Sequence, residues 1–450
     1  MKLEQIENVY FVGIGGIGMS ALARYFKNIG KNVAGYDKTE THLTAALISD
    51  GISIHFTDSI AEIAPEYKNP DNTLVVYTPA IPKEHKELNF FLNENFSVLK
   101  RAAVLGIITK DTFCFAVAGT HGKTTTSSML GHILYQSGVD VTAFLGGIVE
   151  NYQSNLIGSG KTVTVVEADE FDRSFLHLHP NLACITSMDA DHLDIYGDAS
   201  HVEASFIAFS EKVDSKSLFI NNGLPLDAVR VGVDDDSEFV ASNIRIQDGW
   251  YIFDVKTPTD TIENVKLGLP GRHNLTNALL AIAMAKTYGL TNQQICESLE
   301  SFKGVVRRFS YQIKSPDLVY VDDYAHHPTE INAVHHALRE LYPGKQILAV
   351  FQPHLFSRTR DFADGFAESL SQFDEVLLLD IYPARELPID GINSQWLLDK
   401  MALTNKRLIK KEDLITEMCK SSSTVIVTIG AGDIGEMITD IKDALDAKKN

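Results

Sequence analysis

The stretch Phe113-Cys-Phe-Ala-Val-Ala-Gly-Thr-His-Gly-Lys-Thr-Thr-Thr126 decides the fold of this chain. Its apolar first half predicts a buried strand, the glycines that follow predict a tight loop, and a helix is predicted over residues 127–136. A strand, a loop containing Gly-Lys-Thr and a helix, in this order, indicate a phosphate-binding loop at the carboxyl end of a parallel strand. The central part of the chain is therefore predicted to be an α/β domain of the P-loop ATPase type.

The side chains of this loop suit a nucleotide phosphate. Backbone N–H groups around Gly122 would cradle the β-phosphate, the Lys123 ammonium would neutralise developing charge, and the Thr124 hydroxyl would ligate Mg²⁺. The loop is shorter than the full pattern, because Val117 occupies the place of the first glycine. The strand and helix around it favour a phosphate site over a chance Gly-Lys-Thr.

On both sides of this loop, short apolar runs rich in β-branched residues alternate with amphipathic stretches. This alternation predicts an α/β fold with mostly parallel sheets. The predicted strands cover residues 9–14, 74–77, 113–118, 163–167, 183–187, 318–321, 347–351, 375–379 and 424–429.

Glycine, proline and charged residues interrupt the alternation near 106–112 and 304–316. A chain of 450 residues is long enough for about three domains. We therefore expect three domains at 1–108, 109–312 and 313–450, with a Rossmann-like fold in the first and the third.

The first domain carries its own diphosphate signal, Gly13-Ile-Gly-Gly-Ile-Gly18, directly after a predicted strand and before a helix. Glycines at these positions allow a tight turn and a close backbone approach, and the new helix N-terminus offers N–H groups to a pyrophosphate. Asp37 follows the next strand at the usual distance for a ribose hydroxyl. Taken alone, this pattern favours NAD, but it identifies a diphosphate site and not the nucleotide.

Two further strands end in acidic residues. The run 163–166 leads into Glu167-Ala-Asp-Glu170, and the run 183–187 leads into Asp189, Asp191, His192 and Asp194. The carboxyl ends of parallel strands meet at one edge, and Mg²⁺ prefers carboxylate oxygens there. We expect these acids and His192 to face the phosphate loop, with His192 contacting metal or phosphate.

The rest of the chain supplies basic and amide groups. His273 and Asn277 are four residues apart on a predicted helix and share a face, whereas Asn274 is equally suited to capping that helix. Arg308 precedes the third domain, and two strand ends there carry Asp322-Asp-Tyr-Ala-His-His-Pro-Thr-Glu330 and Gln352-Pro-His-Leu-Phe-Ser-Arg358. Arginine and histidine at such edges suit carboxylate and phosphate recognition.

Composition excludes several classes of protein. Lys plus Arg number 40 and Asp plus Glu number 59, which gives 40 − 59 = −19 and argues against nucleic-acid binding. The four cysteines lie far apart, so neither a disulfide framework nor a zinc cluster is expected. The N-terminus lacks the layout of a signal peptide, and no apolar run reaches about 18 residues. We expect a cytoplasmic protein without membrane insertion.

In this fixed order the motifs resemble the Mur ligase family along essentially the whole chain, and most closely the members that join L-alanine to UDP-N-acetylmuramate. The resemblance implies that the first domain binds the UDP-sugar and not NAD, the second ATP, and the third the amino acid. It implies ATP-dependent amide formation through an acyl phosphate, with Mg²⁺ or Mn²⁺, in peptidoglycan precursor synthesis. Since ATP residues would come from two domains, it also implies domain closure.

The resemblance assigns roles residue by residue. The UDP-sugar would be bound by Gly15, Gly16, Ile17, Gly18 and Asp37. ATP would be bound by Gly119, Thr120, His121, Gly122, Lys123, Thr124, Thr125, His273, Asn277, Arg308 and Asp323. The catalytic set would be Lys123, Glu167 and His192, the metal ligands Thr124, Glu167 and His192, and the alanine pocket Tyr324, His326 and Arg358. Leu355 stands where the family pattern has arginine, and Phe171 where it has serine.

Three other functions remain open at this point. A ligase that recycles a murein tripeptide onto the same UDP-sugar would share the ATP residues. An NAD-dependent oxidoreductase would explain residues 13–18 and Asp37 but not the phosphate loop. A nucleotide switch would explain that loop but not the other sites. We expect a monomer or a weak homodimer.

Overall fold

The structure is a computed structural model that describes residues 3–169, 171–189, 199–384 and 386–448. The chain divides into two compact units. The first comprises residues 1–244, 253–266 and 276–303, and the second comprises 245–252, 267–275 and 304–450. Three parallel-rich sheets with helices confirm the predicted α/β class, and every predicted strand has a counterpart within two residues at either end. The predicted domain boundaries near 108 and 312 stay a prediction.

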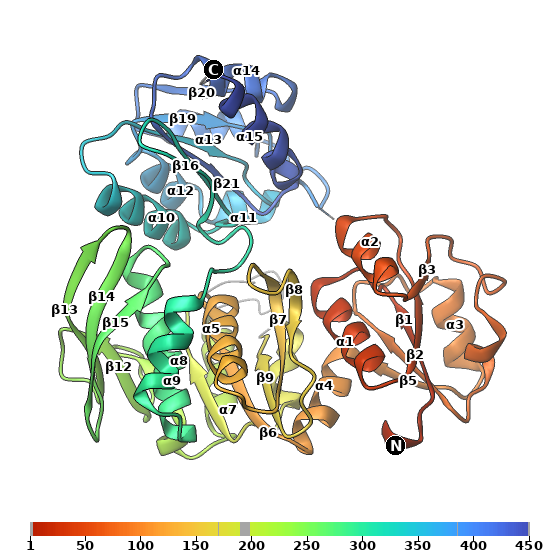
Figure 1. Cartoon of the computed structure of the whole chain (residues 1–450). Coiled ribbons are helices and arrows are strands. Elements are labelled where there is room, and N and C mark those ends of the chain that lie inside the picture. Colours follow the sequence, from red (N-terminus) through yellow and green to blue (C-terminus); the bar gives the residue numbers. More distant parts are fainter. Residues whose placement is uncertain (1–2, 170, 190–198, 385, 449–450) are drawn as a thin grey trace. The chain divides into compact units, whose positions relative to one another are not determined.

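The first sheet of unit 1 has five strands in the order β3-β2-β1-β4-β5, all parallel (Figure 1). The strands are β1 (Asn8–Val12), β2 (Asn32–Tyr36), β3 (Ser53–His55), β4 (Thr73–Tyr77) and β5 (Ser97–Lys100), and the helices are α1 (Ile17–Asn28), α2 (His42–Ser49) and α3 (Lys86–Asn93). The strand order reverses between β1 and β4, which places a ligand crevice beside the glycine loop that follows β1.

Helix α1 packs its apolar face against this sheet because Met19, Leu22, Ala23 and Phe26 recur at helical spacing and are buried. Its N-terminus therefore stays at the carboxyl edge of the strands, where the glycine loop ends.

The second sheet has ten strands in the order β15-β14-β13-β12-β11-β10-β6-β9-β7-β8. Its strands are β6 (Phe113–Ala118), β7 (Val141–Val149), β8 (Ser154–Ile157), β9 (Val163–Glu167), β10 (Leu182–Ile185), β11 (Leu218–Asn221), β12 (Val229–Val233), β13 (Phe239–Gln247), β14 (Trp250–Lys256) and β15 (Thr261–Leu267). The accompanying helices are α4 (Arg101–Lys110), α5 (Lys123–Gln136), α7 (Ala199–Ser210), α8 (Arg272–Tyr288) and α9 (Asn292–Ser301). The phosphate-loop strand β6 lies between β10 and β9, parallel to both, so the acid-tipped strands flank the loop.

The sheet of unit 2 has six strands in the order β16-β17-β21-β18-β19-β20, parallel except for the antiparallel edge strand β16. The strands are β16 (Ser310–Lys314), β17 (Val319–Asp323), β18 (Ile347–Phe351), β19 (Glu375–Leu378), β20 (Lys406–Leu408) and β21 (Val425–Ile429). The helices are α10 (Pro328–Leu341), α11 (Phe356–Asp361), α12 (Ala363–Leu370), α13 (Ser394–Lys400), α14 (Leu414–Lys420) and α15 (Ile438–Ala447). The motifs after β17 and β18 thus leave the sheet at its carboxyl edge.

The start of helix α5 differs from its prediction by four residues. Helix α5 begins at Lys123 and not at Ser127, because Gly122 adopts a left-handed conformation with φ 82° and serves as the N-cap residue. The lysine and threonines of the loop therefore belong to the first turn of the helix. Within the described part of the chain, no helix combines the length and apolar character needed to cross a membrane.

Candidate active site

The phosphate loop is held by the exit of strand β10. The Thr120 hydroxyl donates to the carbonyl of Asp189 (2.8 Å), and the His121 N–H donates to the Ser187 hydroxyl (2.8 Å). The Lys123 ammonium folds back over the loop and donates to the carbonyls of Gly119 (2.5 Å) and Thr120 (3.2 Å). The predicted loop residues thus lie together, with the Lys123 ammonium above the loop backbone. A bound phosphate oxygen would accept the hydrogen bonds that these two carbonyls accept.

Glu167 lies directly beside this loop. Its Oε1 accepts a hydrogen bond from the Thr124 hydroxyl (3.0 Å), and its Oε2 accepts one from the N–H of Gly146 (2.8 Å). A Cβ atom placed on Gly146 would lie 2.4 Å from Oε2, so the absence of a side chain there makes room for the carboxylate. The sequence pattern predicted Glu167 but not Gly146, whose role depends on packing between β7 and β9.

The donor set of this corner suits Mg²⁺. A hydroxyl and a carboxylate side by side are hard oxygen ligands, and Mg²⁺ keeps several waters and takes phosphate oxygens for the rest of its coordination shell. The third predicted ligand, His192, lies outside the described residues, as do Asp191 and Asp194. Among the residues that the structure describes, no group of three or more His, Cys, Asp or Glu side chains could hold a metal ion by itself.

The two residues assigned to adenine are in different units. In unit 1, a Cβ on Gly122 would lie 2.5 Å from Oδ1 of Asn277, so the Asn277 amide lies against the phosphate loop. In unit 2, the exposed His273 lies over Gly271, whose added Cβ would come within 2.5 Å of the imidazole. Asn274 is buried, and its amide donates to the carbonyl of Pro270 (2.6 Å) at the start of α8.

The glycine loop of the first sheet is ordered by Asp37. The carboxylate accepts hydrogen bonds from the N–H groups of Gly15 (2.7 Å) and Thr39 (3.2 Å). The structure thus brings Asp37 to the loop, where each of its carboxylate oxygens accepts a backbone N–H group. The predicted contact of Asp37 with a ribose hydroxyl stays a prediction.

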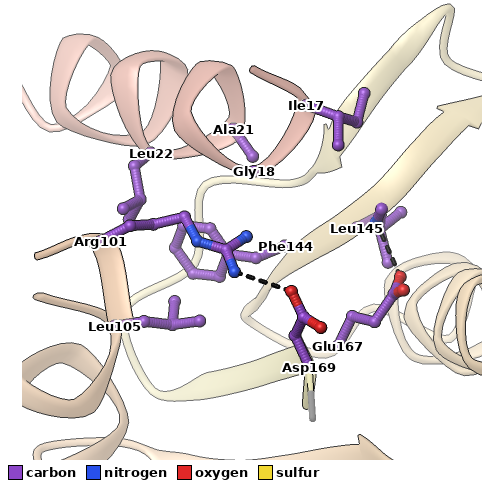
Figure 2. Close-up of a pocket in the computed structure, with 11 residues that line it drawn as sticks. Ile17, Gly18, Ala21, Leu22, Arg101, Leu105, Phe144, Leu145, Glu167 and Asp169 are labelled. Atoms are coloured by element: carbon purple, nitrogen blue, oxygen red, sulfur yellow. Dashed lines mark hydrogen bonds and ion pairs between the residues drawn. The ribbon is translucent and has the colours of Figure 1, made fainter. Parts of the chain in front are cut away.

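A pocket of about 160 Å³ opens beside this loop, between α1, the start of α4, and strands β7 and β9 (Figure 2). It is lined by Ile17, Gly18, Ala21, Leu22, Arg101, Leu105, Phe144, Leu145, Gly146, Glu167 and Asp169. Figure 2 shows Arg101 reaching between Gly18 and Asp169, with Glu167 beside Asp169. No sequence motif surrounds Arg101, and only the fold brings it to the glycine loop.

In unit 2, Asp323 ends strand β17 and is 7% exposed. Its carboxylate accepts hydrogen bonds from the N–H groups of Phe309 (2.7 Å) and Ala325 (2.7 Å). Burial raises the pKa of Asp323 to about 7, although the Arg308 guanidinium and the two N–H donors act in the opposite direction. Asp323 therefore joins the segment that follows β17, at Ala325, to the turn before β16, at Phe309.

Glu330 links two of the predicted residues of unit 2, Arg308 and His326. Its carboxylate lies 3.6 Å from the Arg308 guanidinium and 3.4 Å from Nδ1 of His326, and it accepts the N–H of His326 (2.9 Å). The Arg308 guanidinium lies 5.3 Å from the centre of the Tyr324 ring. The sequence analysis quoted Glu330 but gave it no role, because its contacts depend on how α10 packs beside β17.

The predicted alanine-pocket residues also lie near one another. Arg358 is 8% exposed, and its Nη1 lies 3.4 Å from Nδ1 of His354. The His354 ring lies 6.4 Å from that of His326 and is stacked on Tyr382 at 5.8 Å. Burial lowers the pKa of His326, opposed by Glu330 and assisted by Arg358. An uncharged imidazole, a guanidinium and aromatic rings can together bind a small zwitterion through its carboxylate.

Leu355, where the family pattern has arginine, is held by backbone contacts. It precedes α11 with φ 71°, and its N–H donates to the carbonyl of Tyr382 (2.9 Å). Arg307 belongs to the motif before the third domain but had no predicted role. Its guanidinium pairs with the buried Asp322 (2.8 Å) and donates to the carbonyl of Gly430 (2.7 Å), which ties two loops of this edge together.

Known protein families and relatives match this chain over nearly its whole length. Three family models match it: "Mur ligase family, catalytic domain" over residues 8–112, "Mur ligase middle domain" over 117–285, and "Mur ligase, glutamate ligase domain" over 307–444. The UDP-N-acetylmuramate–L-alanine ligase of Flavobacterium psychrophilum is 70% identical over 449 residues, which covers 100% of both chains. That of Flavobacterium johnsoniae is 67% identical and covers 99% of both.

Solved structures give the same picture. The UDP-N-acetylmuramate-alanine ligase of Thermotoga maritima superposes with a TM-score of 0.83 at 28% identity, covering 98% of this chain and 99% of its own. A murein peptide ligase from Psychrobacter arcticus reaches a TM-score of 0.69 at 22% identity and covers 98% of each chain, which shows a shared fold only.

Proposed function

Because the chain belongs to the Mur ligase family, we infer that it catalyses the ATP-dependent ligation of L-alanine to the lactyl carboxylate of UDP-N-acetylmuramate, a step of peptidoglycan precursor synthesis. The observation that carries this inference is identity of 70% over the full length of a ligase with this activity in its name. The phosphate loop beside Glu167 supplies the chemistry that such a reaction requires.

A carboxylate is a poor electrophile and must be activated before an amine can attack it. In the proposed reaction, a lactyl carboxylate oxygen attacks the γ-phosphorus of ATP, and the bond to the β-phosphate oxygen breaks to release ADP. The amine of alanine then attacks the acyl carbon, and phosphate leaves with its bonding electrons while the amine loses a proton. Lys123 and the loop N–H groups would stabilise the charge on the phosphoryl group during the first step.

The proposed metal ligands are Thr124, Glu167 and His192, of which the first two are in hydrogen-bond contact. Bound Mg²⁺, or Mn²⁺ in its place, would neutralise phosphate charge and draw the carboxylate and ATP together. The Thr124 hydroxyl and the Gly146 N–H each donate to one oxygen of Glu167, which supports a defined position for these two proposed ligands.

We assign the remaining substrates by the same reasoning. The UDP-sugar would bind at Gly15–Gly18 and Asp37, where α1 offers its N-terminus. L-Alanine would bind at Tyr324, His326 and Arg358, with the Arg358 guanidinium on the alanine carboxylate. We propose the cytoplasm as the compartment, since both nucleotides are made there, and a monomer or weak homodimer as the assembly.

The recycling ligase for murein tripeptides is not favoured, because eight full-length relatives of 45–70% identity are named alanine ligases. An NAD-dependent oxidoreductase is not favoured either, since it leaves the phosphate loop without a role.

One assay tests the proposal. Phosphate release is measured with ATP, Mg²⁺ and UDP-N-acetylmuramate against a panel of amino acids and the murein tripeptide. Turnover with L-alanine and not with the tripeptide is expected. Turnover with the tripeptide alone would assign the chain to the recycling reaction, and NADH binding without phosphate release would contradict the family assignment of function.

A further inference from the structure

The pocket between the glycine loop and Glu167 contains two charged residues, Arg101 and Asp169, that have no role in the proposed reaction. Most of its lining is apolar or small, and the ionic side chains in it are Arg101, Glu167 and Asp169. Arg101 is the only cation among the described residues that line this pocket. It is the first residue of α4, so its side chain comes from the N-terminal part of unit 1, whereas both acids come from strand β9 and its exit.

Arg101 is held in the pocket by two contacts. Its Nη2 pairs with Oδ2 of Asp169 at 3.1 Å. Its Nη1 lies only 2.0 Å from the position that a Cβ on Gly18 would take, so the guanidinium rests on the bare backbone of the glycine loop. The third glycine of the loop therefore makes room for this arginine. A sequence-based interpretation assigns that space to helix packing or to the ligand itself.

The guanidinium retains unused hydrogen-bonding capacity. It carries five N–H donors, and among the described residues only Asp169 accepts from it. The Arg101 side chain is 29% exposed, so a ligand in the pocket can reach it. Because the Asp169 side chain is also 37% exposed, the ion pair is weak in water and can be exchanged at small cost.

The charges that line the pocket mean that an anion needs Arg101 in order to bind there. Two carboxylates line the pocket and the whole chain has a net charge of −19, so an incoming oxyanion would be repelled without a local cation. The proposed acceptor substrate has to bring anions here, since its pyrophosphate would lie at the start of α1 and its lactyl carboxylate near Glu167. Arg101 lies between these two places (Figure 2).

We propose that Arg101 binds an oxyanion of the UDP-sugar, and that this oxyanion displaces Asp169 from the guanidinium when the substrate enters. The proposal rests on the proposed function, because it takes the substrate from it. The oxyanion is either the pyrophosphate or the lactyl carboxylate. A tetrahedral phosphate and a planar carboxylate can each accept two parallel hydrogen bonds from an arginine.

The test measures binding by calorimetry, without ATP, for UDP-N-acetylmuramate, UDP-N-acetylglucosamine and UDP. The variant is Arg101→Gln, and the matched control is Lys110→Gln, which removes the same charge from the exposed end of the same helix. Loss of a charge-assisted hydrogen-bonded pair is expected to weaken binding about tenfold to a hundredfold. If Arg101→Gln binds all three ligands more weakly, Arg101 contacts the pyrophosphate. If it binds only UDP-N-acetylmuramate more weakly, Arg101 contacts the lactyl carboxylate.

Asp169→Asn separates exchange from a purely structural ion pair. If substrate displaces Asp169, removing its charge leaves affinity unchanged or increases it, whereas Arg101→Gln decreases it. A structural link would make both variants lose affinity together. Arg101→Lys, which keeps the charge, should recover part of the loss.

Two results would overturn the proposal: equal affinities of wild type and Arg101→Gln for all three ligands, or parallel losses in Arg101→Gln and Asp169→Asn. Either result leaves the proposed function standing as long as the wild-type chain binds UDP-N-acetylmuramate and releases phosphate with L-alanine. Circular dichroism and the melting temperature of each variant confirm that the binding data come from folded protein.

Discussion

The Thr124 hydroxyl donates a hydrogen bond of 3.0 Å to Oε1 of Glu167 and so joins the phosphate loop to the acid at the end of the neighbouring strand. Strands β6 and β9 are parallel, with Val117 opposite Glu167, so the loop and the carboxylate leave the sheet at the same level. One end of this contact belongs to the first turn of α5, and the other is fixed from behind by the N–H of Gly146.

Replacing Lys123 by Ala is expected to reduce phosphate release at least about a hundredfold, because the developing charge on the phosphoryl group loses its cation. Lys123 donates to loop carbonyls and lies in the first turn of α5, where alanine also favours a helix, so the melting temperature should change little. The measurement is steady-state phosphate release with a thermal scan. Lys161→Ala, exposed in the same unit, is the control that should keep full activity. Near-normal turnover of Lys123→Ala would remove the loop from the ATP site.

Gly146→Ala should lower the apparent affinity of the enzyme for Mg²⁺ about tenfold to a hundredfold, as is usual when a residue that positions a metal ligand is changed. The half-saturating Mg²⁺ concentration should rise accordingly. The three atoms nearest to the added Cβ all belong to the Glu167 carboxyl group, the closest at 2.4 Å, so the carboxylate must move away from Thr124. Gly146 is exposed, and the fold should tolerate the methyl group. A Mg²⁺ titration of phosphate release measures the effect. An unchanged half-saturating Mg²⁺ concentration would mean that Glu167 is not a ligand.

Asn155→Ala should lower the thermal stability of unit 1, with a cost of about 1–3 kcal/mol. Asn155 is fully buried, donates to the carbonyl of Ile17 (2.5 Å) and to the Ser20 hydroxyl (2.9 Å), and accepts from Arg24 (2.5 Å). Its removal leaves these groups of α1 without their partner on β8. Differential scanning calorimetry is the measurement, and Asn28→Ala at the exposed end of α1 is the control. Equal melting temperatures for the two variants would contradict the assigned role.

Asp323 should make the stability of unit 2 depend on pH. Its pKa of about 7 in the folded chain lies above the ordinary value, so between about pH 4 and pH 7 the folded state holds a proton that the unfolded state has released. The contribution of Asp323 to the free energy of unfolding therefore falls as pH rises through this window. Asp323→Asn cannot ionise, and its melting temperature relative to wild type should rise from pH 4 to pH 7 and then level off.

The control for this series is Asp317→Asn, an exposed carboxylate of the same unit whose difference from wild type should stay flat with pH. A flat difference for Asp323→Asn as well would show that Asp323 is ionised throughout, held by Arg308 and the two backbone N–H donors.

Local patterns were enough for the order of strands, loops and helices. The run 113–118 is strand β6 with the same bounds as predicted, because a short apolar run that ends in a glycine loop is typical of a buried strand. The start of α5 was predicted four residues too late, at Ser127. The helix begins at Lys123, directly after the left-handed Gly122. A backbone conformation of this kind is not visible in hydrophobic periodicity.

The sequence by itself determined the α/β class, the family, and the residue types that lie at the carboxyl edges of the strands. Each of these follows from short runs, since periodicity and loop composition act over a few residues. Only the tertiary structure decided which of these residues touch. Arg101 rests on Gly18, Gly146 leaves room for Glu167, and Glu330 links Arg308 to His326. These pairs lie up to 83 positions apart, and contact across such distances depends on how helices and strands pack, which no local pattern records.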